Sequence, residues 1–253
     1  DILILVLCGF LADCSDFSEI EDYGNDEIDF LRSDLGLNLE HGIPSEDTIN
    51  RVFRHLDPQE LEKSLRSCCQ EIVKNVEGKH FCIDGKTLRG TIKNKGNSDQ
   101  VQLVSVWLSA EKVQFSQVQI ASKTNEIKAI PELLDTIDCE GSTITIDAIA
   151  SQRSITEKII EKKADYLIGL KSNQGSLFEQ VSDWLRSRKT TLPSFIEIDK
   201  DHGRGEIRST YVCEDLHFLE ETYEWSGLRS IVMTECRRIV DGKETTSERF
   251  YIS

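Results

Sequence analysis

The spacing of apolar residues in the first 77 positions predicts helices. Within residues 45–56 the apolar positions recur every three or four residues, as they do along the buried face of a helix: Ile49, Val52, Phe53 and Leu56. Ser45 precedes this face and is a suitable N-cap. Asp57 and Pro58 then suit the start of a second helix, whose apolar positions are Leu61, Leu65, Cys68, Cys69 and Ile72. We therefore expect a small helical domain over residues 1–77.

The chain opens with an apolar run from Asp1 to Ala12, DILILVLCGFLA. This run is too short to cross a bilayer, and it lacks the basic flank and the small-residue cleavage site of a signal peptide. We expect a buried first helix instead. Because position 1 is not an initiator Met, we expect a chain that was cut or numbered from inside a longer one.

From Gly78 onward, short apolar runs alternate with amphipathic segments. Strands are expected at 80–84, 101–109, 112–120, 142–147 and 165–170. Helices are expected at about 125–137 with an interruption at Pro131, after an N-cap at Ser151 or Ser154, and at about 174–186. The resulting order, β-β-β-α-β-α-β-α, is that of the ribonuclease H-like fold, an α/β fold with a mixed sheet and flanking helices.

The last part of the chain returns to strand patterns. Strand candidates lie at 195–199, 206–212, 229–240 and 247–253, separated by turns that contain Gly and Asp. We therefore expect three parts: the helical domain at 1–77, a ribonuclease H-like core at 78–190 and a β-rich segment at 191–253.

Composition describes a globular protein with no cysteine-based metal site. A chain of 253 residues with 38% hydrophobic and 30% charged side chains suits one large domain or two modest ones. The eight cysteines include no C-x-x-C pair and have no His at ligand spacing, which argues against zinc. We expect them to be buried, reduced thiols in a cytoplasmic protein.

The formal net charge of −15 is unusual for a protein that holds DNA, because such proteins commonly carry a basic surface. The acidity is unevenly distributed. Residues 1–77 carry 18 acidic and six basic side chains, residues 78–190 carry 14 and 16, and residues 191–253 carry 13 and eight. Net charge bears on non-specific association rather than on fold, so the nearly balanced middle part stays compatible with nucleic-acid binding.

Two acidic residues close predicted strands: Asp84 ends the 80–84 strand and Asp147 ends the 142–147 strand. Ligands of open α/β sheets collect beyond the carboxyl ends of strands. Two carboxylates on adjacent strands can hold a pair of divalent ions about 3.5–4 Å apart, and oxygen ligands suit Mg²⁺ or Mn²⁺. Acids after strands also cap turns, and from spacing alone that role is the more frequent one.

Six blocks give these acids a context: FCIDGKTLRG, KTNEIKAIPELLDTID, ITIDAIASQ, DYLIGLKSNQ, DHGRGEIR and WSGLRSIVMTECRR. In this order they resemble bacterial insertion-sequence transposases of the DDE type, in the group that includes the H-repeat-associated, Rhs-linked proteins. The segment GIPSEDTINRVFRHLDP resembles the helical domain associated with these transposases. The similarity spans almost the whole chain.

The resemblance implies a ribonuclease H-like DDE catalytic core with an inserted β-rich segment. It implies metal-dependent cleavage and joining of DNA at the ends of the element, with Asp84 and Asp147 as the first two catalytic, metal-binding acids. It also implies two Mg²⁺ or Mn²⁺ ions in the complete enzyme. The implied partners are double-stranded terminal repeats and target DNA, bound by a homodimer that is cytoplasmic and nucleoid-associated.

Two features depart from the family's pattern. Ala150 and Ser151 stand where the family usually has Gly and Cys. The family's third acid lies on a helix after the β-rich segment, in a block resembling HW-IEN-LHW, and no such block precedes Ser253. We therefore expect a trimmed chain or a natural remnant whose third acid lies beyond residue 253. Such a chain should neither cleave nor join DNA by itself at a useful rate.

Two other functions stay open at this point. One is a catalytically inactive, domesticated remnant that acts as a binding protein, which the acidic charge favours. The other is a ribonuclease H-like nuclease that uses Glu179 or Asp183, on the predicted 174–186 helix, as its third acid. The resemblance argues against the second alternative.

Eight residues are candidate DNA contacts: Lys86, Arg89, Lys93, Lys171, Asn173, Gln174, His202 and Arg204. The first three follow Asp84 and would meet phosphates beside the metals, unless they lie in a solvated loop. The next three follow the 165–170 strand, a position that favours substrate contact. The last two lie in a turn, in a block where Glu206 and Arg208 favour cross-strand pairing equally well.

Overall fold

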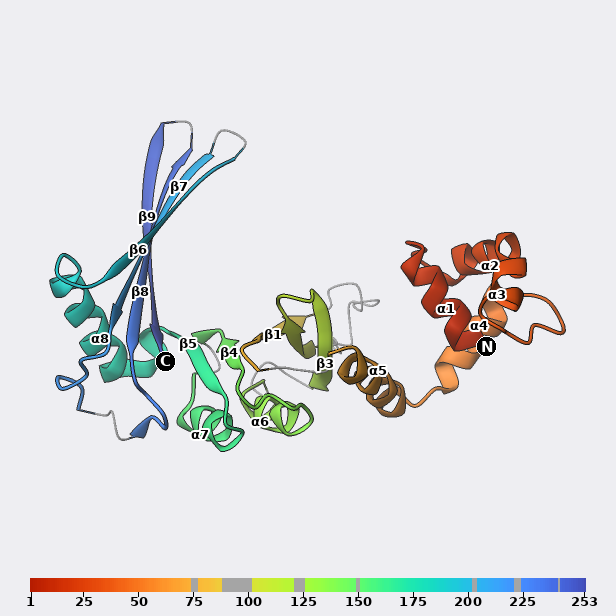
Figure 1. Cartoon of the computed structure of the whole chain (residues 1–253), viewed down its shortest axis with the longest axis horizontal. Helices are drawn as coiled ribbons and strands as arrows, with labels where there is room; N and C mark the ends of the chain where they lie inside the picture. The colour runs from red at the N-terminus through yellow and green to blue at the C-terminus, as the bar shows by residue number, and fades with distance from the viewer. Residues whose placement is uncertain are drawn as a thin grey trace, which may run out of the picture. The chain divides into compact units, whose positions relative to one another are not determined.

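The structure, a computed structural model, describes residues 1–73, 77–87, 102–120, 126–148, 151–201, 204–220, 224–240 and 242–253. The chain divides into two compact units, Asp1–Leu65 and Arg66–Ser253 (Figure 1). The first unit is helical, and the second is built on a large β-sheet. The three-part division expected from the sequence, with boundaries after residues 77 and 190, stays a prediction.

The first unit contains helices α1 (Ile2–Leu11), α2 (Phe17–Asp26), α3 (Ile28–Ser33) and α4 (Glu46–His55). Their buried faces form a small core of Leu5, Val6, Ile20, Leu31, Leu37, Leu39 and Ile49. Helix α4 has Ser45 at its N-cap position, as predicted. Helix α5 (Pro58–Ile72) begins where Asp57 and Pro58 indicate, and the Asp57 carboxylate accepts a hydrogen bond from the Gln59 N–H at 2.8 Å.

Helix α1 forms as predicted, but the expectation that it is buried is wrong. Only one face is buried, at Leu5, Val6 and Gly9, and a Cβ on Gly9 would lie 2.7 Å from the Ile20 side chain of α2. Leu11, by contrast, is 80% exposed. Packing against α2 covers only one stripe of a helix that is apolar all round. Among the described residues, no helix is long and apolar enough to cross a membrane.

The second unit contains one sheet of nine strands in the part of the chain that the structure describes. The first five are β1 (His80–Thr87), β2 (Gln102–Leu108), β3 (Val113–Ile120), β4 (Thr143–Ile146) and β5 (Asp165–Leu170). The last four are β6 (Ser194–Asp201), β7 (Arg204–Cys213), β8 (Ile231–Val240) and β9 (Lys243–Ile252). The strand order is β3-β2-β1-β4-β5-β9-β8-β7-β6.

The sheet is mixed. β1 pairs with β4 and β4 with β5 in parallel, and the other described pairs are antiparallel. The α/β class is confirmed, and the strands predicted at 80–84 and 142–147 are neighbours in the sheet. The strand candidates after residue 190 are strands too, and they continue the sheet because β9 pairs with β5.

Strand β1 runs past Asp84 to Thr87, so the expectation that Asp84 ends this strand is wrong. The reason is its antiparallel partner. β2 stays paired with β1 from Asp84, opposite Ser105, to Thr87, whereas the parallel pairing with β4 stops at Ile83 and Ile146. At Asp84, therefore, β1 is still paired with β2 but no longer with β4.

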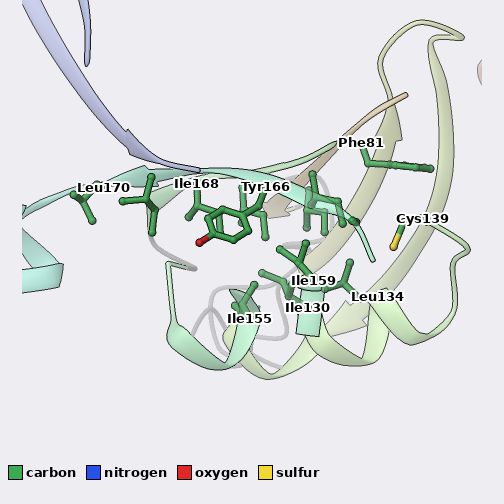
Figure 2. Close-up of a cluster of buried hydrophobic side chains, with 14 of the residues drawn as sticks. Phe81, Ile130, Leu134, Cys139, Ile155, Ile159, Tyr166, Ile168 and Leu170 are labelled. Atoms are coloured by element: carbon green, nitrogen blue, oxygen red, sulfur yellow. The ribbon is translucent and has the colours of Figure 1, made fainter. Parts of the chain in front are cut away.

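Helices α6 (Glu126–Asp135) and α7 (Arg153–Glu161) cover one face of the sheet around β1, β4 and β5. Figure 2 shows side chains of α6 and α7 directed toward Phe81, Tyr166 and Ile168 of the sheet. These helix residues are Ile130, Leu134, Ile155 and Ile159. Helix α6 continues through Pro131, so the expected interruption there is absent. Helix α8 (Gly175–Arg188) follows the short 3₁₀ helix η4 (Ser172–Gln174) and packs against β8 and β9.

The start of α7 differs from the prediction. The helix begins at Arg153 with Gln152 at the N-cap position, not with Ser151 or Ser154. Ser151 is buried, and its carbonyl oxygen accepts a hydrogen bond from the Gln174 side chain at 2.9 Å. The chain at Ser151 is therefore tied to the end of β5, and the helix starts after it.

All eight cysteines are free, as expected, but the expectation that they are buried is only partly correct. Cys139 and Cys213 are buried, whereas Cys68 on α5 is exposed. Burial raises the pKa of the Cys139 thiol. Because a protonated thiol is a poor nucleophile, Cys139 has a packing role in the core shown in Figure 2.

We expect Ile144→Ala to destabilise the second unit by about 2–5 kcal/mol, because Ile144 is fully buried between the sheet and the helices. Ile196→Ala is the matched control, since Ile196 on β6 is 58% exposed, and it should change the free energy of unfolding by less than about 0.5 kcal/mol. Denaturant titration measures both. Equal effects of the two substitutions would contradict the assignment of this core.

Candidate active site

The register between β1 and β4 places Asp84 and Asp147 side by side. Ile83 pairs with Ile146, and the next residue on each chain segment is the acid. Paired strands lie about 4.8 Å apart, so the two backbones are close at this level. Ile83 and Ile146 are both buried on the face that carries α6 and α7. Because side chains alternate along a strand, the two carboxylates belong to the opposite face.

That opposite face of β1 and β4 is polar. His80 and Cys82 precede Asp84 on it at two-residue spacing, and the His80 Nε2 lies 2.8 Å from the Thr145 Oγ1. The other ring nitrogen of His80 lies 3.1 Å from the Ser109 Oγ. This polar cluster is not among the sites predicted from the sequence, although the alternation of His80, Cys82 and Asp84 with apolar Phe81 and Ile83 indicates it.

Lys171 directly follows β5 and forms an ion pair with Asp147. Its Nζ lies 3.2 Å from one carboxylate oxygen and 3.4 Å from the other. The two side chains are 62% and 59% exposed. Ion pairs this exposed contribute about 0–1 kcal/mol, since water competes with them. Asp147 thus holds a positive charge against both of its oxygens, in a pair that is easily broken.

Asn173 and Gln174, predicted as DNA contacts, are turned toward the backbone that follows Asp147. The Asn173 Nδ2 donates a hydrogen bond to the Ala148 carbonyl oxygen at 3.0 Å. The Gln174 Nε2 donates to the Ser151 carbonyl oxygen at 2.9 Å and is 3.5 Å from the Ala148 oxygen. These contacts bind η4 to the segment after the second acid. A DNA contact by either side chain stays a prediction.

An open pocket of about 730 Å³ lies next to Asp147, between the ends of β4, β5 and β9 and the helix α8. Its lining includes three basic residues, Lys171, Arg186 and Arg249. The Arg186 Nε donates to a Glu248 carboxylate oxygen at 2.9 Å, and its guanidinium lies over the Phe250 ring. Asp147 therefore borders a solvent-open space lined by three basic residues and two acidic ones, with Lys171 paired to Asp147 and Arg186 paired to Glu248.

Of the other five predicted DNA contacts, Lys86 and Arg204 lie among the described residues. Lys86 is exposed on β1, two residues after Asp84 and on the same face. Arg89, Lys93 and His202 lie outside the described residues. Arg204 begins β7 and pairs with residues 201 and 240 in the ladders of β6 and β8.

In the same block, cross-strand pairing is present. Buried Glu206 pairs with Arg208 on its own strand and with Arg238 on β8, and Arg208 also reaches Glu197 on β6 at 3.3 Å. A buried carboxylate needs such partners, because an unpaired charge inside a protein is costly. These ion pairs connect side chains of β6, β7 and β8, which the backbone ladders already join.

No third acid joins the pair in the part of the chain that the structure describes. Within that part, no group of three or more His, Cys, Asp or Glu side chains is arranged to hold a metal ion. Glu179 and Asp183, the candidates for a third corner, lie on α8, where Asp183 is 82% exposed and 3.9 Å from Arg186. They therefore form no such group with Asp84 and Asp147.

Comparison with known proteins defines the class of this chain. The family described as "Transposase DDE domain" matches residues 76–232, and the family described as "DDE_Tnp_1-associated" matches residues 1–68. The chain belongs to the DDE transposase family and carries the family's associated N-terminal domain. This confirms the resemblance found in the sequence.

Individual relatives agree with this assignment. YncI of Escherichia coli O157:H7, a predicted transposase, is 36% identical over 260 residues, which cover 100% of this chain and 66% of that protein. YhhI of Escherichia coli K12, an H repeat-associated predicted transposase, is 33% identical and is covered to 68%. The chain thus spans about two thirds of the length of these relatives.

The solved piggyBac transposase synaptic complex with hairpin DNA is 15% identical over 71% of this chain and 44% of that one. Its TM-score of 0.36 is too low to define the fold.

We expect Lys171→Met to strengthen Mn²⁺ binding by up to about fivefold, because the substitution removes the cation that competes for the Asp147 carboxylate. Lys163→Met is the matched control, since Lys163 forms a slightly more exposed ion pair with Glu140 at 2.9 Å. Isothermal titration calorimetry gives the affinity of both variants. Weaker binding by Lys171→Met would mean that Lys171 supports the metal site instead of competing with the ion.

Proposed function

We propose that this protein belongs to an insertion-sequence transposase that cleaves DNA strands at the ends of its element and transfers them with the help of divalent metal ions. The β1–β4 register carries the proposal, because it sets Asp84 and Asp147 at adjacent positions in a chain of the DDE family. We also propose a ribonuclease H-like core. The order of elements from β1 to α8, β-β-β-α-β-α-β-α, supports it.

The two acids fit the role of metal ligands. Both are exposed carboxylates on the polar face of the sheet, and oxygen ligands of this kind suit Mg²⁺ and Mn²⁺. The ammonium of Lys171 lies against both oxygens of Asp147, so a positive charge is accommodated there. When bound, two such ions would activate the attacking water or 3′-hydroxyl and stabilise the leaving oxygen.

The chain's own residues then have distinct tasks. Asp84 and Asp147 would hold the ions through their carboxylate oxygens. Lys171, whose ammonium now pairs with Asp147, would be free to contact a DNA phosphate if a metal ion took its place on that carboxylate. Lys86, on the same face as Asp84, offers a further positive charge to the backbone of the DNA. Arg249, on the rim of the pocket, lies within reach of the same strand.

Double-stranded DNA is the proposed partner, in the form of terminal repeats and target DNA bound by a homodimer. The strong excess of acidic side chains lies in residues 1–77, outside the sheet that carries the two acids. Non-specific attraction to DNA is therefore weak and sensitive to salt. Contacts made by the second unit must supply the affinity.

We expect Asp84→Asn and Asp147→Asn, each made in the complete protein encoded at this locus, to slow Mg²⁺-dependent strand cleavage at the terminal repeats by at least about 100-fold. A lost metal ligand removes several kcal/mol of transition-state stabilisation. Cleavage of a labelled terminal-repeat duplex measures the rate. Asp165→Asn is the matched control, because Asp165 is exposed on β5 but lies at the opposite end of that strand.

Three outcomes would overturn or redirect the proposal. Cleavage that survives both substitutions in a folded protein would remove the two acids from the site. Binding of terminal repeats without cleavage would favour the inactive binding protein. Preferential cleavage of an RNA–DNA hybrid would favour a ribonuclease H-like nuclease.

A further inference from the structure

The segment after β5 is joined to the segment after β4 by side-chain amides. β4 leads directly into Asp147, and the described residues that follow it, Ala148 and Ser151, are each about 1% exposed. Their carbonyl oxygens accept hydrogen bonds from Asn173 and Gln174 at 3.0 and 2.9 Å. A strand end followed by two anchored carbonyls has little freedom to move.

The Gln174 side chain forms hydrogen bonds with both segments. While its Nε2 donates to Ser151, its Oε1 accepts a hydrogen bond from the Lys171 backbone N–H at 3.3 Å. One amide group, on the last residue of η4, is therefore bonded both to Lys171, the residue directly after β5, and to the segment after Asp147. We call the side chains of Asn173 and Gln174, with these hydrogen bonds, the amide clasp.

Close packing at Gly169 brings the two segments together. A Cβ at Gly169 would lie 3.0 Å from the Ala148 backbone nitrogen, a distance at which the neighbouring backbone would have to shift. The Ala148 N–H in turn donates to an Asp147 carboxylate oxygen at 2.8 Å. The absence of a side chain at Gly169 thus lets β5 approach the residue that orients the second acid.

We infer that Asn173 and Gln174 are positioning residues for Asp147: they hold the backbone after the acid so that its carboxylate meets the metal in one orientation. The inference rests on the proposed function, and it assigns these two amides a role other than DNA contact. Second-layer groups that orient a metal ligand commonly change metal affinity by roughly 10–100-fold when they are removed. The clasp acts through Asp147 and does not itself touch the ion.

The test uses neutral substitutions of similar size, so that no charge is added near the site. In the 253-residue chain, the double variant Asn173→Leu with Gln174→Met removes all the donors of the clasp. Asn25→Leu is the matched control, because the Asn25 Nδ2 also donates to a backbone carbonyl, that of Glu21, at 2.9 Å but in the first unit. Asp147→Asn reports whether the ion binds at the acid at all.

Two readouts separate positioning from a merely structural role. The first is Mn²⁺ binding, measured by calorimetry and by the electron paramagnetic resonance spectrum of the bound ion. We expect the double variant to bind Mn²⁺ roughly tenfold more weakly, with an altered spectrum. The second is hydrogen exchange of the Ala148 amide, which needs no metal and should become faster. Asn25→Leu should change neither.

The outcomes distinguish the inference from the proposed function. Wild-type affinity, spectrum and Ala148 exchange in the double variant would overturn the clasp and leave the proposed function intact. Mn²⁺ binding that is absent, or that persists in Asp147→Asn, would defeat the proposed metal site. Hydrogen exchange at Ala148 would then decide the clasp by itself, with faster exchange in its support and unchanged exchange against it. A double variant that fails to fold is replaced by Gln174→Met alone.

Discussion

The parallel pairing of β1 with β4 is the constraint on which the rest of the second unit depends. Four residue pairs, from His80 with Thr143 to Ile83 with Ile146, fix both faces of the sheet at once. On one face they bury the apolar side chains under α6 and α7. On the other they leave a polar surface that ends in two adjacent carboxylates. A slip by one residue would exchange the faces of the moved strand and turn its acid toward the apolar core.

The neighbouring strands build the surroundings of this pair. β2 extends the sheet beside Asp84, while β5 delivers Lys171 and η4 to Asp147. Within residues 169–174, Lys171 pairs with Asp147, and the side-chain amides of Asn173 and Gln174 donate to the backbone after it. Gly169 leaves room for this close approach. One cation and several hydrogen bonds therefore meet on Asp147 and the backbone after it. Asp84 has no counterpart to this support among the interactions of the described residues; its backbone pairs with Ser105 of β2, one residue past the last β1–β4 pair.

Local patterns in the sequence predict much of this arrangement, because alternation and capping depend on neighbouring residues. The strands around Asp84 and Asp147, the start of α5 at Pro58 and the mixed α/β class follow from them. The family motifs select the two acids. The length of β1 does not follow, because Gly85 and Lys86 resemble a turn until β2 pairs with them.

The contacts of Lys171, Asn173 and Gln174 with the segment after β4 could not be predicted from the sequence, for a related reason. Their bonds to Asp147, Ala148 and Ser151 join residues more than 20 positions apart, and the β4–β5 pairing brings those residues together. The exposure of α1 could not be predicted either, since an apolar run indicates burial but not how many neighbouring elements are present to cover it. Tertiary pairing decides these features, and short sequence windows do not contain it.

The most direct measurement of the central claim is a crystal structure of the protein soaked with Mn²⁺, with the ion located by its anomalous scattering. The account predicts a peak within ligand distance, about 2.0–2.4 Å, of carboxylate oxygens of both Asp84 and Asp147, with the Lys171 ammonium moved away from Asp147. A peak bound to other residues, or the two carboxylates turned to different sides of the sheet with no shared ion, would contradict it.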